Sequence, residues 1–203
     1  MEKVFGVYAI DFKRALVNVE KGISKDFANE ALKGFLFKVS KEEVKIITCN
    51  GHAIFETSLQ PVSWIVDNEE EYFMGEILLE AFKLPTKKVT VGDIVFFRIK
   101  DSNKVEVVLN NTSVVVNIID AKYPDTEEVW ESFTKEKVAE IYLNPSYLKD
   151  MLDGMESFPI SSKHTKIIKL EVYNDGVVFR TIDIPYEKDN VKVKKLLLKL
   201  REP

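Results

Sequence analysis

The sequence predicts an α+β protein in which a single unit, made of a strand, a helix and three further strands, occurs three times along the chain. Runs of alternating apolar residues end at turn residues, and apolar stripes at helical spacing separate some of these runs. The same order of elements then returns twice. With 45% hydrophobic and 11% aromatic residues, the 203-residue chain can bury one large core or two small ones.

The first unit begins with a strand expected over residues 4–10. Asp11 is a good N-cap residue for the helix that follows it. The apolar stripe of this helix consists of Phe12, Ala15, Leu16, Val19 and Ile23. Strands are expected over residues 32–39, 44–48 and 53–59, with a turn at residues 50–51 between the last two.

The second unit repeats this order, starting with a strand expected over residues 62–66. The helix expected next ends before Pro85, and its apolar stripe consists of Phe73, Ile77, Leu78, Ala81 and Leu84. Strands are then expected over residues 89–100, 104–109 and 112–119, with Asp, Ser and Asn residues in the turns between them.

The third unit has the best helix start signal. A strand over residues 138–143 leads to Asn144, an N-cap residue, and to Pro145 at the first helical position, where the missing N–H costs nothing. The stripe of this helix consists of Tyr147, Leu148, Met151, Leu152 and Met155. The remaining strands are expected over residues 166–173, 177–183 and 191–200, with a hairpin turn at residues 174–176.

A polar stretch over residues 122–137 separates the second unit from the third and is the best candidate for a domain boundary. We expect residues 1–125 to form a complete domain of two units. We expect residues 126–203 to form a smaller domain of one unit.

Composition and motifs exclude several functional classes. The N-terminus lacks the order of a signal peptide and no apolar stretch could span a bilayer, so we expect a cytoplasmic protein. A single cysteine, Cys49, cannot form an internal disulfide, and with two histidines it offers no zinc motif. Cys49 and His52 also stand too close in sequence for a typical catalytic pair. Without a phosphate loop or nucleophile elbow, we expect no enzyme activity, cofactor or metal.

Four segments carry a resemblance to a known family. Residues 29–54 contain the matches Leu32, Gly34, Leu36, Phe37, Gly51 and His52 to the patterns R-x-x-L-N-G-V-L-F-E and V-A-T-D-G-H-R-L. Residues 123–129 are similar to F-P-D-Y-x-x-V, residues 141–152 to F-N-x-x-Y-L-x-D-x-L, and residues 196–201 to V-V-M-P-M-R. In this order the patterns are those of the bacterial DNA polymerase III beta subunit, the sliding clamp. The departures are Asn29 for Arg, Cys49 for Thr, Asn50 for Asp and Ala53 for Arg.

The resemblance implies a DNA-clamp-like fold of about one and a half clamp domains, because each clamp domain contains two units. It also implies an apolar pocket between domains that binds peptide motifs of DNA polymerase and clamp-loader proteins. The implied wall consists of Leu32, Cys49, Gly51, His52, Ile54, Pro124, Val129, Leu196 and Leu198. Taken singly, the leucines and Val129 could equally be core residues, and Gly51 a turn glycine.

The clamp family lines its central hole with helices that face double-stranded DNA. Here only the first helix region is clearly basic, through Lys13, Arg14, Lys21 and Lys25. Acidic residues instead mark the other two expected helices: Glu71, Glu76 and Glu80 on the second, and Asp150, Asp153 and Glu156 on the third. Two hypotheses follow: a homo-oligomeric processivity factor that encircles DNA, or a clamp-derived peptide-binding adaptor or inhibitor that does not.

Overall fold

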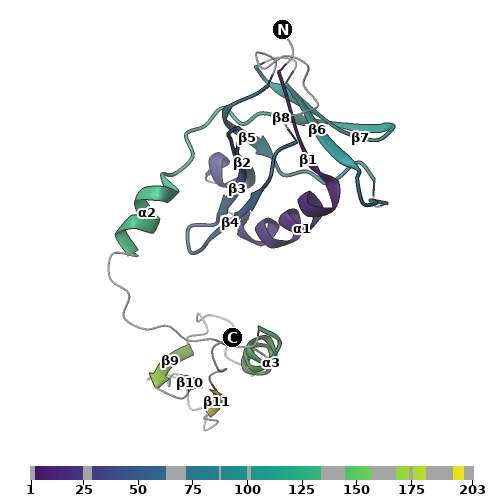
Figure 1. The fold of residues 1–203 in the computed structure, drawn as a ribbon. Helices are drawn as coiled ribbons and strands as arrows, with labels where there is room; N and C mark the ends of the chain where they lie inside the picture. The colour runs from purple at the N-terminus through teal and green to yellow at the C-terminus, as the bar shows by residue number, and fades with distance from the viewer. Residues whose placement is uncertain are drawn as a thin grey trace. The chain divides into compact units, whose positions relative to one another are not determined.

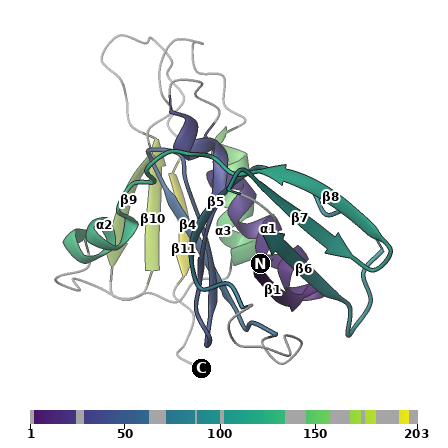
Figure 2. The ribbon, with the colours of Figure 1, turned by 90° about the horizontal axis from the view of Figure 1, so that it is seen from above.

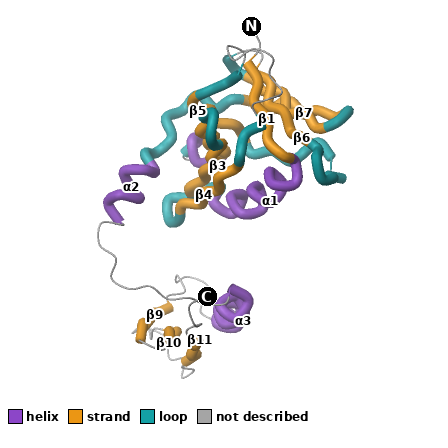
Figure 3. The backbone as a smooth tube through the Cα atoms, in the orientation of Figure 1, coloured by secondary structure: helices purple, strands orange, loops and turns teal. Residues whose placement is uncertain are grey.

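The computed structural model describes residues 3–24, 29–62, 72–86, 88–99, 102–133, 145–156, 168–173, 176–181 and 194–198. The chain divides into two compact units, Met1–Ser132 and Phe133–Pro203. Figure 1 labels their elements, and Figure 3 separates helices from strands by colour. The mixed α and β composition agrees with the predicted fold class.

Two four-stranded antiparallel sheets form the framework of the first unit (Figure 2). The β1 sheet has the order β1 (Lys3–Tyr8), β6 (Ile94–Ile99), β7 (Lys104–Leu109) and β8 (Thr112–Asn117). The β2 sheet has the order β4 (Ile54–Leu59), β3 (Val44–Cys49), β2 (Gly34–Val39) and β5 (Gly75–Glu80). The predicted three-stranded groups of the first two repeats are thereby confirmed.

The first two repeats exchange strands. β1 opens the first repeat but pairs with β6 of the second, with Phe5 opposite Phe97. β5 lies where the helix of the second repeat was expected, and it pairs with β2 of the first, with Phe35 opposite Leu79. Each sheet is therefore completed by a strand from the other repeat, so neither repeat forms its sheet alone.

Aromatic side chains fill the space between the two sheets. Phe5 and Phe97 stack at a centroid distance of 4.5 Å, and Phe12 meets Phe97 edge-to-face at 5.3 Å. Helix α1 (Ala9–Val19) closes this core with its buried residues Ala9, Phe12, Ala15, Leu16 and Val19. The stripe predicted from the sequence is thus the buried face, with Ile23 half-buried beyond the helix end.

The start of α1 differs from the prediction. Asp11 is not the N-cap, because the helix begins at Ala9 and Tyr8 occupies the cap position without a side-chain hydrogen bond. The Ala9 N–H instead donates to the Asp93 carbonyl at 2.8 Å, so the chain before β6 serves as the cap. Asp11 lies in the first turn, where a carboxylate complements the helix dipole.

The prediction of a helix from the apolar stripe between Phe73 and Leu84 is wrong. Residues 75–80 form strand β5 instead, in which Ile77, Leu78 and Leu79 are all buried. A strand covered on both faces carries a continuous apolar run, and such a run cannot be distinguished from a helix stripe by periodicity. The carboxylates Glu76 and Glu80 therefore belong to a strand.

The segment between β5 and β6 has no helix in its described residues, 81–86 and 88–93. Phe82 from this segment packs into the core, with ring centroids 5.7 Å from Phe35, 6.2 Å from Phe12 and 6.3 Å from Phe97. The segment thus contributes an aromatic side chain to the core without a helix in its described residues.

The second unit contains helix α3 (Pro145–Glu156) and a three-stranded antiparallel sheet. The sheet has the order β11 (Lys194–Leu198), β10 (Gly176–Thr181) and β9 (Ile168–Tyr173). The helix start at Pro145 and all three strands are as predicted. The expected strand over 138–143 and residues 63–66 of the strand expected over 62–66 lie outside the described residues.

Helix α2 (Thr126–Phe133) was not predicted, since its residues belong to the polar stretch assigned to the boundary. The division between the two units falls at its C-terminal end. Across the described ranges, no helix is both long and apolar enough to cross a membrane.

Candidate functional site

The β2 sheet is apolar on both faces, which distinguishes it from a sheet with one solvated side. Because side chains alternate along β2, Phe35 and Phe37 enter the main core while Leu36 points to the opposite face. A second cluster has formed on that outer face. Its buried members are Ala31, Leu32, Leu36, Ile47, Leu78 and Tyr123, and the half-buried Cys49, Ile54 and Ile119 pack against them.

Two segments remote in sequence are held over this outer face. The Asn29 side chain accepts a hydrogen bond from the Ala31 N–H at 3.1 Å and starts the short 3-10 turn Glu30–Lys33, which carries Leu32. On the other side, the Ile119 N–H donates to the Leu78 carbonyl at 2.9 Å. This bond and the bridge between Ile118 and Leu79 hold the start of residues 118–125, here called the connector, beside β5.

The connector ends at α2, whose first turn is firmly capped. The Asp125 carboxylate accepts hydrogen bonds from the Glu127 N–H at 3.1 Å and the Glu128 N–H at 3.0 Å. Lys38 Nζ then joins the helix to the sheet, at 2.9 Å from Glu127 and 3.2 Å from Glu76. Burial opposes the charge on Lys38, but hydrogen bonds and attraction from these two carboxylates outweigh it and raise the pKa of the lysine.

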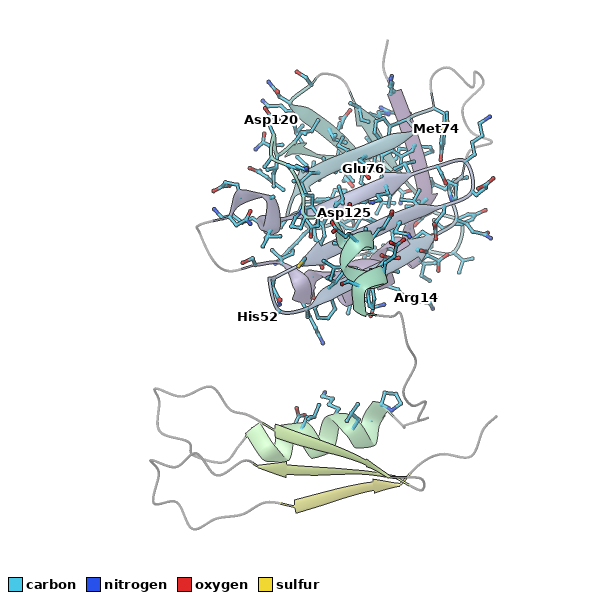
Figure 4. The ribbon with its side chains drawn as sticks, turned by 90° about the vertical axis from the view of Figure 1, so that its left-hand side faces the viewer. Arg14, His52, Met74, Glu76, Asp120 and Asp125 are labelled. Atoms are coloured by element: carbon cyan, nitrogen blue, oxygen red, sulfur yellow. The ribbon has the colours of Figure 1, made fainter. Side chains whose placement is uncertain are left out.

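The β3–β4 turn lies at the end of the same sheet. Asn50 Oδ1 accepts hydrogen bonds from the His52 N–H at 3.0 Å and the Ala53 N–H at 2.9 Å. Gly51 has a φ of +85°, which favours glycine, so it serves as a turn glycine here. The Gly51 N–H also lies 3.4 Å from Cys49 Sγ. His52 is exposed at the turn (Figure 4).

The structure brings part of the predicted pocket wall together. Leu32, Cys49 and Ile54 belong to one cluster, although they come from three different elements. Pro124 follows the buried Tyr123 in the connector, and Val129 is 39% exposed on α2. Gly51 and His52 lie at the β3–β4 turn. These seven residues all belong to the first unit.

Leu196 and Leu198 lie in strand β11 of the second unit, opposite Val178 and Gly176 of β10. Their side chains lie outside the described part of the chain. Sequence reasoning missed Leu36, Ile47, Leu78 and Ile119 as members of the outer cluster. Leu36, Ile47 and Leu78 alternate with core residues of the same strands, and this alternation was the available signal, whereas Ile119 lies in the connector and carried no such signal.

Four residues were predicted to face DNA. Lys13, Arg14 and Lys21 are exposed on α1 and the turn after it, and Arg14 lies 3.6 Å from Asp11 (Figure 4). Lys25 is outside the described residues. In the described ranges, no group of three or more His, Cys, Asp and Glu side chains is arranged to hold a metal ion.

No protein-family model matches the chain, and no curated protein matches it. Solved structures do. The DNA polymerase sliding clamp of Bacillus subtilis matches 97% of this chain with a TM-score of 0.74 at 13% identity. This chain has the sliding-clamp fold. A DNA polymerase III beta subunit from Eubacterium rectale matches 97% of it with a TM-score of 0.72 at 14% identity.

The sliding clamp of Bartonella birtlesii, solved in complex with griselimycin, matches 99% of the chain with a TM-score of 0.67 at 13% identity. The chain spans about half the length of these sliding clamps: 49% of the Bacillus protein, 50% of the Eubacterium protein and 52% of the Bartonella protein.

Tyr123 gives the outer cluster an unusual polar group. The side chain is buried, and its hydroxyl lies near the Cys49 backbone without a hydrogen bond of good geometry. Burial in the cluster, with a smaller contribution from Cys49, raises the pKa of Tyr123 well above its usual value. A buried hydroxyl without a hydrogen-bond partner costs free energy.

We predict that Tyr123→Phe leaves the free energy of unfolding unchanged or raises it by up to about 1 kcal/mol, because it removes an unsatisfied polar group. Because burial raises the pKa of Tyr123 in the folded protein, the phenol of the unfolded chain ionises at a lower pH than that of the folded protein. The free energy of unfolding is therefore unaffected by this group below about pH 10 and falls as the pH rises further. Urea unfolding at neutral and alkaline pH should show a smaller alkaline loss in this variant. Tyr8→Phe, at an exposed tyrosine, is the control. A loss of several kcal/mol at neutral pH would show that the hydroxyl is bonded.

Proposed function

We propose that the protein is a sliding-clamp-like, non-enzymatic and cytoplasmic protein of DNA replication that binds short peptide motifs of polymerase and other replication proteins. Residues 1–125 would be a complete clamp-like domain of two repeats, and residues 126–203 a partial domain of one repeat. The observation that supports this proposal most is the apolar cluster on the outer face of the β2 sheet. It unites Leu32, Cys49 and Ile54 with the connector, all from segments that resemble the clamp family.

The chemistry of this surface suits an extended peptide. The half-buried Cys49 and Ile54 offer an apolar contact, and the exposed Val129 of α2 offers another. Pro124 keeps the connector rigid. A peptide with one aliphatic and one aromatic anchor would cover these groups. The predicted wall also includes Leu196 and Leu198, which lie in β11 of the second unit.

We predict that Ile54→Ala and Val129→Ser each weaken binding of such a peptide about five- to tenfold, as expected for losing roughly 1 kcal/mol of apolar contact. Fluorescence anisotropy of a labelled peptide with one leucine and one phenylalanine anchor measures this. Val115→Ser, at an exposed valine of β8 outside the cluster, is the matched control and should bind like the unaltered protein. Equal affinity for all four proteins would place the peptide elsewhere, and no binding at all would reject the proposed function.

A second proposal concerns double-stranded DNA and self-association. The exposed Lys13, Arg14 and Lys21 support a homo-oligomer that encircles DNA. The adaptor or inhibitor alternative is supported by the described residues between β5 and β6, which contain no second helix to face DNA. Since the chain spans about half of the matched clamps, both assemblies remain proposals about this protein.

The two alternatives differ in salt dependence. If the α1 lysines and arginine contact phosphates, Lys13→Glu combined with Arg14→Glu should weaken DNA binding and reduce the slope of log affinity against log salt by about 1 to 2. Lys104→Glu, at an exposed lysine at the start of β7, is the control. A protein that stays monomeric by solution mass, and binds peptide but no DNA, would reject the ring and support the adaptor.

A further inference from the structure

A groove of about 680 Å³ lies along the connector, whose residues 118–125 all line it. This volume is within the range of about 300–1,000 Å³ that ligand pockets occupy. Its floor is apolar and includes Leu36, Phe73, Leu78, Ile99 and Ile118. Leu36, Leu78, Ile119 and Tyr123 belong to both the groove and the outer cluster. The groove and the outer cluster are therefore adjacent.

The rim of the groove is negatively charged. Four carboxylates line it, Glu76, Asp120, Asp125 and Glu127, against two lysines, Lys38 and Lys122, which gives a net charge of −2. Lys38 lies between Glu76 and Glu127, so these three groups together leave one negative charge, and Asp120, Asp125 and Lys122 leave the other. Figure 4 shows Glu76, Asp120 and Asp125 in one region of the unit, on β5 and along the connector.

The acidic character continues beyond the groove. Glu128 and Glu131 are exposed on α2, next to the exposed Val129. Ala53 stands where the clamp pattern has Arg, so the β3–β4 turn adds no positive charge at this position. A ligand that crosses from the outer cluster into the groove would thus meet apolar contacts below it and carboxylates around it.

We propose that this groove binds the basic flank of the peptide, so that the partner proteins carry Lys or Arg residues beside their apolar anchor. The inference rests on the proposed function, since the anchor would occupy the outer cluster. Lys and Arg fit this groove because their aliphatic stems can lie on its apolar floor while their charged ends reach the rim carboxylates. The same charge disfavours nucleic acid, whose phosphates would be repelled. Charge complementarity therefore selects a cationic peptide segment.

Three labelled peptides with the same leucine and phenylalanine anchor test the inference when their flanking residues are all Lys, all Ser or all Glu. We expect the Lys-flanked peptide to bind at least about threefold more tightly than the Ser-flanked one at low salt, and the Glu-flanked one to bind most weakly. At roughly 1 M salt, where the Debye length is about 3 Å, the three affinities should converge.

Asp120→Asn removes one rim charge at an exposed position without changing side-chain size, and should reduce the advantage of the Lys-flanked peptide about two- to threefold. Glu20→Gln, at an exposed carboxylate after α1, is the matched control and should leave the advantage unchanged. Equal binding of all three peptides at low salt would overturn this inference while leaving the proposed function in place. Binding of none of them would overturn both.

Discussion

The burial of the β2 sheet on both faces is the constraint on which the rest of the first unit depends. One face carries Phe35 and Phe37 into the aromatic core, and the other carries Leu36 and Ile47 into a second cluster. An antiparallel sheet with two apolar faces needs a cover on each. The β1 sheet and α1 cover the inner face, whereas a 3-10 turn and the connector cover only part of the outer face.

The partial cover links the fold to the proposed function. The connector is pinned to β5 through the Ile119–Leu78 bond, and α2 is pinned to β2 and β5 through Lys38. These bonds hold Tyr123 inside the cluster while Cys49, Ile54 and Val129 stay partly accessible. A surface that is preformed in this way loses little conformational entropy when an extended peptide binds.

Much of this could be predicted from the sequence, because local patterns and long-range packing agree there. The strands of both three-stranded groups agree with the alternation of apolar residues and with turn residues such as Gly51. Helix α3 begins at Pro145, where the sequence has its helix start signal. The prediction failed where long-range packing decided the outcome. Ile77, Leu78 and Leu79 form a strand because β5 pairs with β2 and packs against an apolar cluster on each face. No local sequence pattern indicates this long-range packing. Tyr123 was part of a quoted motif, but its burial depends on the sheet that it covers.

Cys49 permits the most direct test of the central claim, since it is the single cysteine of the chain and lies half-buried in the outer cluster. The measurement is the rate at which a small alkylating reagent modifies its thiol, with and without the anchored peptide. The account predicts that the rate falls as the peptide is titrated, in proportion to the fraction of protein that remains free. An unchanged rate at saturating peptide would show that the peptide binds away from the β2 sheet and would contradict the account.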